Sequence, residues 1–282
     1  MTLTSATFQR VAVDGGHIAV WVDGTGPRVL LLHGGPGLSA DLLDELVEEL
    51  VPGYEVALYQ QRGLAPSTED GPFTIAQAVA DAVAVLDALH WDKAFVVGHS
   101  WGGHLALHIA AAAPDRVLGV LSIDPMGGVG DGGSGAFEAE MFARTPEADR
   151  ERAQLLDERA LRGEGTPEEM VESLALVWPA YFADPAKASP PATQISLAAY
   201  MGGFESMMSE LPRLEASLDS ITVPVGLVAG GGSPMPVDLA SHATAERLPN
   251  AWVEVVPNAG HFVWIEAPGS VRRALDRLTG ST

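Results

Sequence analysis

Gly98-His99-Ser100-Trp101-Gly102-Gly103 is the stretch of sequence that decides the fold of this chain. It follows a short apolar run over 94–97 and precedes an apolar helical pattern over 101–113. Strand, sharp turn and helix in this order, with G-x-S-x-G at the turn, are typical of an elbow that projects a nucleophilic serine out of a sheet. The glycines let the neighbouring chain pass without a Cβ clash. We therefore predict that Ser100 is a catalytic nucleophile.

A second motif lies after an earlier apolar run over 29–32, where residues 33–37 read H-G-G-P-G. Acyl transfer through a serine needs N–H donors for the oxyanion of its tetrahedral intermediate. One donor is the N–H of the residue after the nucleophile, here Trp101, and the other comes from a loop after an early strand. We predict Gly35 as the second donor, because glycine lets the backbone approach a substrate closely.

A histidine late in the chain has the position expected of the general base. His261 follows the last strand pattern, over 252–256, and stands on a loop. A base histidine in such an arrangement reaches back to the serine from a loop near the end of the chain. We predict that His261 accepts the proton of Ser100.

These motifs resemble those of the α/β-hydrolase family, and within it the proline iminopeptidase-like group. The resemblance rests on residues 33–37, 98–103, 260–262 (G-H-F) and 266–269 (E-A-P-G), with a looser match at 61–63 (Q-R-G). It implies an α/β fold with a mostly parallel eight-stranded sheet and an inserted helical cap. It also implies a catalytic triad of serine, histidine and an acid.

The acid departs from the pattern of the family that the chain resembles. The usual acid position, after the strand pattern 225–229, is occupied by Ser233, and serine cannot stabilise an imidazolium as a carboxylate does. Asp124 follows the strand pattern 117–123, and catalytic groups collect at the carboxyl ends of strands in open sheets. We predict Asp124 as the triad acid, against a plain turn role for this residue. Asp238, inside a helix pattern, is the alternative acid.

The resemblance and the pattern of elements divide the chain into a core and an insertion. Residues 1–126 and 221–282 form the predicted core, in which helix and strand patterns alternate, as in a mostly parallel sheet. Residues 127–220 form the predicted helical cap, which opens on a glycine-rich stretch expected to be a flexible linker or hinge. Helical patterns in the cap run over 137–142, 149–162, 167–178 and 193–208.

Three cap residues are candidate substrate contacts. The aromatic side chains of Trp178 and Phe204 could line an apolar pocket, although their helical spacing also suits the core of the cap. The resemblance to proline iminopeptidases implies a cap carboxylate that holds a free amine, and Glu205 is the candidate for it. A plain surface position is the alternative for Glu205.

Composition restricts the partners of this protein. Its 282 residues suit one large α/β domain, and a net charge of −21 argues against nucleic acid or an anionic membrane as a partner. The chain has no cysteine, no apolar run of a membrane span's length and no visible secretory signal. We expect a cytoplasmic protein with a small-molecule substrate; the oligomeric state stays open.

Neither a metal nor another cofactor is expected. His104 and His108 are four residues apart on the predicted nucleophile helix, but no third ligand accompanies them. The sequence therefore predicts a serine hydrolase that forms an acyl-enzyme with a small ester, thioester, lactone or amide. The alternatives are a proline iminopeptidase-type aminopeptidase, a C–C bond hydrolase and a catalytically silent ligand-binding relative.

Overall fold

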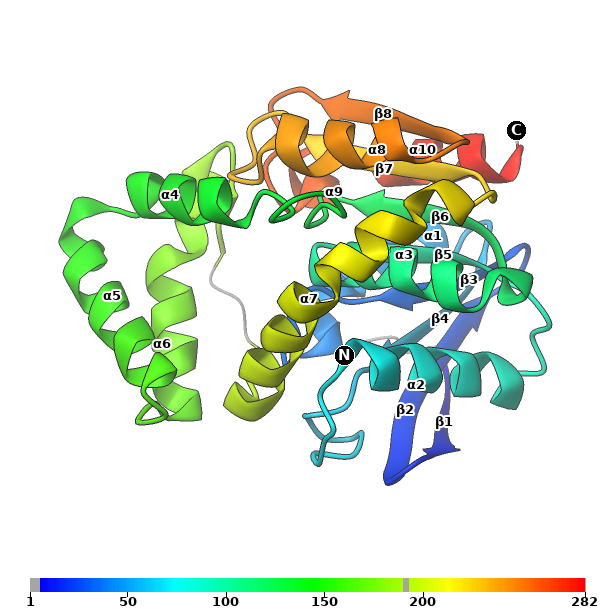
Figure 1. Ribbon diagram of the computed structural model, residues 1–282, viewed down its shortest axis with the longest axis horizontal. Coiled ribbons are helices and arrows are strands. Elements are labelled where there is room, and N and C mark those ends of the chain that lie inside the picture. The colour runs from blue at the N-terminus through cyan, green and yellow to red at the C-terminus, as the bar shows by residue number, and fades with distance from the viewer. Residues whose placement is uncertain (1–5, 190–192, 282) are drawn as a thin grey trace.

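The computed structural model describes residues 6–189 and 193–281 (Figure 1). Segment 1–5, part of the stretch in which no secretory signal was expected, lies outside the described residues, as do 190–192 of the predicted cap and residue 282.

The described residues form an eight-stranded sheet with the strand order β1-β2-β4-β3-β5-β6-β7-β8. β1 pairs antiparallel with β2, β2 pairs antiparallel with β4, and the other neighbouring strands are parallel. The predicted mostly parallel, eight-stranded sheet is therefore confirmed. The strands are β1 (Thr7–Val13), β2 (Gly16–Gly24), β3 (Arg28–Leu32), β4 (Glu55–Gln60), β5 (Ala94–His99), β6 (Val117–Ile123), β7 (Val225–Gly230) and β8 (Ala251–Val256).

Helices cover both faces of the sheet because the strands are apolar on both sides. Successive side chains of a strand point to opposite faces. In β3, Val29 and Leu31 pack with α1 and α10, whereas Leu30 and Leu32 pack with α2 and α3. The helices of the core are η1 (Ala40–Leu43), α1 (Asp44–Leu50), α2 (Ile75–Ala88), α3 (Trp101–Ala112), η2 (Pro114–Arg116), the π-helical η6 (Asp238–His242), α8 (Ala243–Arg247), α9 (Val263–Glu266) and α10 (Ser270–Thr279).

A helical insertion separates β6 from β7. In Figure 1, α5 and α6 stand away from the sheet as a pair, while α7 runs back towards α8. The capping box at the start of α6 agrees with the sequence, since Thr166 Oγ1 accepts the N–H of Glu169 at 3.2 Å. The helices of the insertion are α4 (Ser134–Arg144), α5 (Glu147–Leu161), α6 (Pro167–Val177), η3 (Trp178–Tyr181), η4 (Pro185–Lys187), α7 (Leu197–Ser217) and η5 (Leu218–Ser220). Within the described residues, no helix is both long enough and apolar enough to span a membrane.

The helix predicted over 193–208 has different ends in the structure. It begins at Leu197, because Ser196 caps it by accepting the N–H of Ala199 at 3.3 Å. It continues to Ser217, beyond the predicted end, and carries Pro212 in its interior. The buried residues Met207, Leu211 and Leu214 maintain the apolar face over this longer range.

The glycine-rich stretch after β6 is a closed turn rather than a linker without contacts. The N–H of Gly127 donates to the carbonyl of Gly132 at 2.9 Å, and the carboxylate of Asp131 accepts the N–H groups of Gly133 and Gly135. These backbone contacts lower the pKa of Asp131. Glycine here permits the positive φ angles of a tight turn, and the flexibility of this stretch stays a prediction.

Candidate active site

Ser100 stands on the elbow between β5 and α3. Its φ of +54° is uncommon for a residue other than glycine, and strain of this kind concentrates at functional sites. The N–H of Ser100 donates to the carbonyl of Ile123 at 2.8 Å and so joins the elbow to β6. A Cβ atom on Gly102 would lie 2.4 Å from the carbonyl oxygen of Leu32, so the elbow requires glycine there. The side chain of Ser100 is left half-buried at the carboxyl edge of the sheet.

Asp124 and His261 form a buried pair beside this elbow. Asp124 follows β6 directly, is 1% exposed, and has an Oδ2 atom 2.6 Å from Nδ1 of His261. Its Oδ1 accepts the N–H of Gly230 at 2.9 Å, and its Oδ2 also accepts the hydroxyl of Ser233 at 2.5 Å. Three donors thus satisfy a carboxylate that is almost completely withdrawn from water. With Nδ1 donating to Asp124, Nε2 of His261 carries the free lone pair.

The other candidate acid does not reach the histidine. Asp238 is exposed at the start of η6, after a turn that leads away from β7. Nδ1 of His261 is bonded to Asp124 instead.

The loop that carries His261 is held from the core and from the insertion. The N–H of His261 donates to the carbonyl of Tyr181 in η3 at 2.8 Å, and Nε2 of His99 lies 3.0 Å from the carbonyl oxygen of His261. The ring centroids of His99 and His261 are 4.5 Å apart, which brings His261 next to the neighbour of Ser100. Among the described residues no hydrogen bond joins Ser100 Oγ to His261; such bonds are often long before a substrate binds.

Both predicted oxyanion donors lie around Ser100. Trp101 is the first residue of α3, so its N–H has no acceptor within the helix. A Cβ atom on Gly34 would lie 3.2 Å from Cβ of Ser100, which shows that the loop after β3 contacts the elbow. Gly35 is next in that loop and has a φ of +57°, a conformation that favours glycine. Their role as donors stays a prediction.

Gln61 connects these two elements, and its role escaped the sequence analysis. Its Nε2 donates to the carbonyl of His33 at 3.0 Å, and its Oε1 accepts the indole N–H of Trp101 at 3.0 Å. One side chain therefore fixes the loop after β3 relative to the first residue of α3. The Q-R-G match at 61–63 was the available signal, but the sequence did not reveal its partners.

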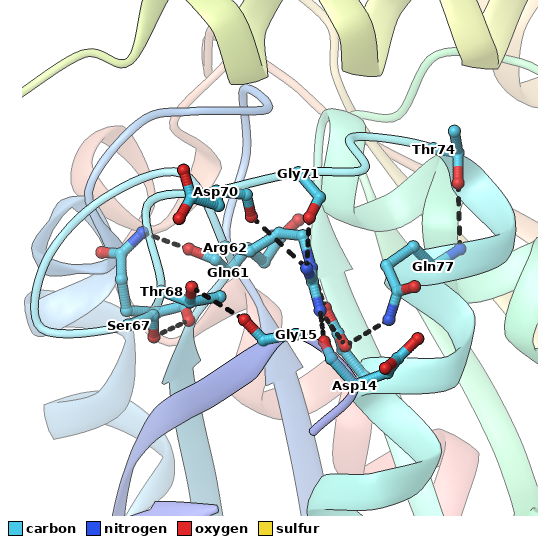
Figure 2. A network of polar contacts seen from close by, with 12 residues as sticks. Asp14, Gly15, Gln61, Arg62, Ser67, Thr68, Asp70, Gly71, Thr74 and Gln77 are labelled. Atoms are coloured by element: carbon cyan, nitrogen blue, oxygen red, sulfur yellow. Dashed lines mark hydrogen bonds and ion pairs between the residues drawn. The ribbon is translucent and has the colours of Figure 1, made fainter. Parts of the chain in front are cut away.

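Arg62 holds the segment that presents Gln61. Figure 2 shows its guanidinium among acceptors from several segments. Nε and Nη2 of Arg62 bond the carboxylate of Asp81 at 2.6 and 2.8 Å, while Nη2 and Nη1 also donate to the carbonyls of Asp14 and Gly71. Because these bonds occupy the buried guanidinium, Arg62 ties the segment to the β1–β2 turn and to α2, and its role is structural.

The three residues predicted as cap contacts have different surroundings in the structure. Phe204 on α7 is half-buried, and its ring lies 6.1 Å from that of Trp101. Trp178 is 4% exposed and packs with its ring 4.7 Å from that of Phe262, in the core between the insertion and the sheet. Glu205 is exposed on α7, and no described contact joins it to the residues around Ser100. Phe204 is thus the one of the three that packs against the elbow.

Rings from the insertion also lie close to His261, although no sequence motif marked them individually for this position. Tyr181 lies 5.2 Å from the ring of His261, and Phe137 on α4 lies 6.3 Å from it, measured between ring centroids. Aromatic side chains of the insertion therefore pack against the ring of His261.

The two histidines of α3 contact each other. Nε2 of His104 lies 3.1 Å from Nε2 of His108, so one ring donates and the other accepts. In the described parts of the chain no three histidine, aspartate or glutamate side chains are grouped to hold a metal ion. Burial lowers the pKa of His104 to about 4 and that of His108 to about 3, and both are therefore neutral near pH 7.

These buried histidines predict a stability that falls with acid. Their pKa values are lower in the folded than in the unfolded state, where histidine titrates near 6.5. Above that pH their contribution is fully present, and it is lost as the pH falls from about 6.5 towards 4, by up to about 1.4 kcal/mol per pH unit for each histidine. Urea midpoints measured between about pH 8 and pH 5 check this. The double variant His104→Leu/His108→Leu should show a flatter dependence, and an equally steep one would contradict the assignment.

The chain belongs to the alpha/beta hydrolase fold family, whose sequence model matches residues 27–268. This assignment agrees with the sheet order and with the strand–elbow–helix geometry at Ser100.

Relatives and neighbours within this family include several hydrolases. Epoxide hydrolase B of Mycobacterium tuberculosis is 38% identical over 112 residues, which are 38% of this chain and 32% of that protein. The chain thus spans about a third of that relative's length. A putative carbamate hydrolase RutD of Caulobacter sp. (strain K31) is 27% identical over 90% of this chain and 91% of that protein. The crystal structure of a proline iminopeptidase-related protein from Thermus thermophilus is similar in fold, with a TM-score of 0.71 at 21% identity over 98% of both chains.

Proposed function

We propose that this protein is a serine hydrolase that cleaves a small ester, thioester, lactone or amide through an acyl-enzyme. The hydrolase names of its relatives support a hydrolase acting on a small substrate. The observation that carries the proposal is the buried hydrogen bond of 2.6 Å between Asp124 and His261. The ring of His261 also packs against that of His99, the neighbour of Ser100.

In the proposed reaction Ser100 Oγ attacks the carbonyl carbon while Nε2 of His261 takes its proton. Asp124 holds the ring through Nδ1 and stabilises the imidazolium that forms. The N–H groups of Gly35 and Trp101 donate to the oxyanion of the tetrahedral intermediate. His261 then gives its proton to the leaving group, and a water molecule, deprotonated by the same nitrogen, hydrolyses the ester on Ser100.

Within the family we place the chain near the proline iminopeptidase-like group. The motifs at 33–37 and 98–103 support this, together with the fold of the Thermus thermophilus neighbour. The exposed position of Glu205 does not support an amine-binding role for that residue, so esters come before aminoacyl substrates in the proposal. A cytoplasmic location stays a prediction that cell fractionation tests.

A labelling experiment and a substrate screen test the proposal. A fluorophosphonate probe should label the wild type at Ser100 and leave Ser100→Ala unlabelled, because the probe forms its bond with an activated serine. p-Nitrophenyl esters of increasing acyl length should be compared with aminoacyl anilides. Absence of labelling, with no turnover of any of these substrates, would support a silent ligand-binding relative instead.

We propose that residues 127–220 act as the cap that selects the substrate, and Phe204 provides the test. Phe204→Ala should change the ratio of kcat/KM between short and long acyl esters by about tenfold, since a pocket discriminates through a few packed groups. Phe142→Ala is the matched control, because this ring on α4 is 47% exposed and its described partner is the guanidinium of Arg150. A parallel loss of stability and of every activity in Phe204→Ala would show that the ring is core only.

A further inference from the structure

The turn after β7 carries Ser233 at the position where the family usually has the acid. The hydroxyl of Ser233 both accepts and donates a hydrogen bond. Ser233 is 9% exposed. Its Oγ accepts the N–H of Met235 at 3.0 Å and lies 2.5 Å from Oδ2 of Asp124. Because the backbone N–H occupies the acceptor side, the hydroxyl proton points to the carboxylate. The same Oδ2 atom accepts Nδ1 of His261, so Ser233 and His261 share one oxygen.

The backbone of this turn is joined to both members of the pair. The N–H of Gly230 donates to Oδ1 of Asp124 at 2.9 Å, and the N–H of Gly232 donates to the carbonyl of Ala259 at 2.8 Å, two residues before His261. A Cβ atom on Gly230 would lie 2.2 Å from the carbonyl oxygen of Gly260. The turn is therefore packed directly against the loop of the base, and its position sets the distance between acid and base.

An arginine of the insertion holds the outer side of the turn. Arg144, the last residue of α4, donates from Nη1 to the carbonyl of Gly232 at 2.5 Å and from Nη2 to the carbonyl of Ser233 at 3.2 Å. Its Nε bonds the carboxylate of Glu140 at 2.7 Å. The guanidinium therefore connects the insertion to the residue that bonds the acid.

We propose that Ser233 is a positioning residue for the Asp124–His261 pair, and that Arg144 holds its turn in place from the insertion. This inference rests on the proposed function. Ser233 occupies the usual position of the acid in the family. Its hydroxyl bonds Asp124, which is the acid of the proposed triad. Its hydroxyl fixes the rotamer of Asp124 and takes up part of the negative charge on the oxygen that faces His261.

Removal of this hydroxyl has two consequences with different readouts. A freer Asp124 orients His261 less well, which lowers kcat. An Oδ2 atom that has lost a donor carries more negative charge and therefore stabilises the imidazolium of His261 more strongly. The acidic limb of the kcat/KM profile then moves to higher pH, which a loss of packing alone does not produce.

Among the described titratable groups around His261, Asp124 is the one that a substitution at Ser233 affects. Burial lowers the pKa of His99, on β5, well below its usual value and raises that of Tyr181, on η3, so both are neutral near pH 7. Glu266, on α9, accepts the N–H of Gly260 at 2.6 Å and is unchanged by a substitution at Ser233.

The test compares Ser233→Ala with Ser233→Thr and with Ser67→Ala, the matched control. Ser67 is 4% exposed and likewise accepts one backbone N–H, from Ala19, and donates one hydrogen bond, to the carbonyl of Gln60, and no described contact joins it to Asp124 or His261. We expect Ser233→Ala to lower kcat about tenfold with KM unchanged. The acidic limb of its kcat/KM profile should move to higher pH by about half a pH unit. Both Ser233→Thr, which keeps the hydroxyl, and Ser67→Ala should show the acidic limb of kcat/KM at the same pH as the wild type.

Arg144 is tested by Arg144→Met beside Arg150→Met. Arg150 follows the same helix and also bonds backbone carbonyls, those of Thr145 and Ala143, but these lie within the insertion. Arg144→Met should move the acidic limb in the same direction as Ser233→Ala by a smaller amount, whereas Arg150→Met should leave it in place. An unmoved limb in Arg144→Met would remove Arg144 from the inference.

A measurement without substrate separates this inference from the proposed function. The Nδ1 proton of His261, held against Asp124, should give a low-field proton NMR resonance that moves in Ser233→Ala and stays in Ser67→Ala. If the resonance moves while no substrate is turned over, the positioning role stands and the hydrolase proposal fails. If substrates are turned over but resonance, limb and kcat of Ser233→Ala match the wild type, the positioning role is overturned.

Discussion

Ser100→Ala should abolish nearly all hydrolysis, with kcat reduced by at least about 10³ and the fold retained. In the proposed mechanism Ser100 Oγ is the one atom of the site that bonds the substrate covalently, so its removal should prevent formation of the acyl-enzyme. The methyl group of alanine fits the elbow, because it keeps the Cβ atom that already stands at a φ of +54°. Turnover of the best substrate from the screen, together with the thermal midpoint, checks this expectation.

The control for this experiment is again Ser67→Ala, which removes a buried hydroxyl elsewhere. Its kcat should stay within about twofold of the wild type, as expected for a change that touches no reacting group. Retention of most of the wild-type activity in Ser100→Ala would end the acyl-enzyme mechanism and would favour direct attack by water.

Asp124→Asn should also lower kcat strongly, by up to about 10⁴. The carboxylate accepts three donors, from His261, Gly230 and Ser233. An asparagine has one acceptor oxygen and presents its amide N–H groups to the remaining donors, so His261 loses either its orientation or its tautomer. At least one buried donor is left without a partner, and we expect a stability loss of about 1–3 kcal/mol. Steady-state kinetics and urea unfolding measure the two effects separately.

Two further variants test whether the acid belongs to this position. Asp238→Asn should leave kcat within about twofold, because Asp238 is exposed and does not contact His261. Asp124→Asn/Ser233→Asp should recover about tenfold or more of the lost activity, since the oxygen of Ser233 already lies 2.5 Å from the atom that bonds His261. The assignment of Asp124 does not survive if Asp124→Asn keeps more than about a tenth of the wild-type kcat.

The sheet, the elbow and the positions of serine and histidine could be predicted from the sequence because local patterns encode them. Apolar runs of strand length alternate with helical patterns, and glycines mark the turns that need them. Ser100 was identified by neighbours within three residues on either side, and its predicted strand–turn–helix setting is confirmed. His261 was identified by its place after the last strand, a property of chain order that needs no contact.

The cap was less predictable because its helices lack such motifs and pack through long-range contacts. The predicted start of the 193–208 helix was wrong, because a serine cap decided it, and the hydrogen-bonded turn in the glycine-rich stretch was not predicted. Aromatic spacing could not distinguish Trp178, which is core, from Phe204, which packs against the elbow, because both patterns fit a buried helical face.

By itself the sequence determined the fold class, the nucleophile elbow and the two candidate acids, because these depend on residue order and on short-range backbone geometry. Only the tertiary structure decided which carboxylate meets His261 and which partners Ser233, Gln61 and Arg144 bond. Each of these contacts joins residues that are distant in the chain, from 28 residues for Gln61 and His33 to 137 for Asp124 and His261. Such contacts exist because β3 lies between β4 and β5, because β6 and β7 are neighbours in the sheet, and because the insertion contacts the turn after β7. No local pattern specifies the distances that result.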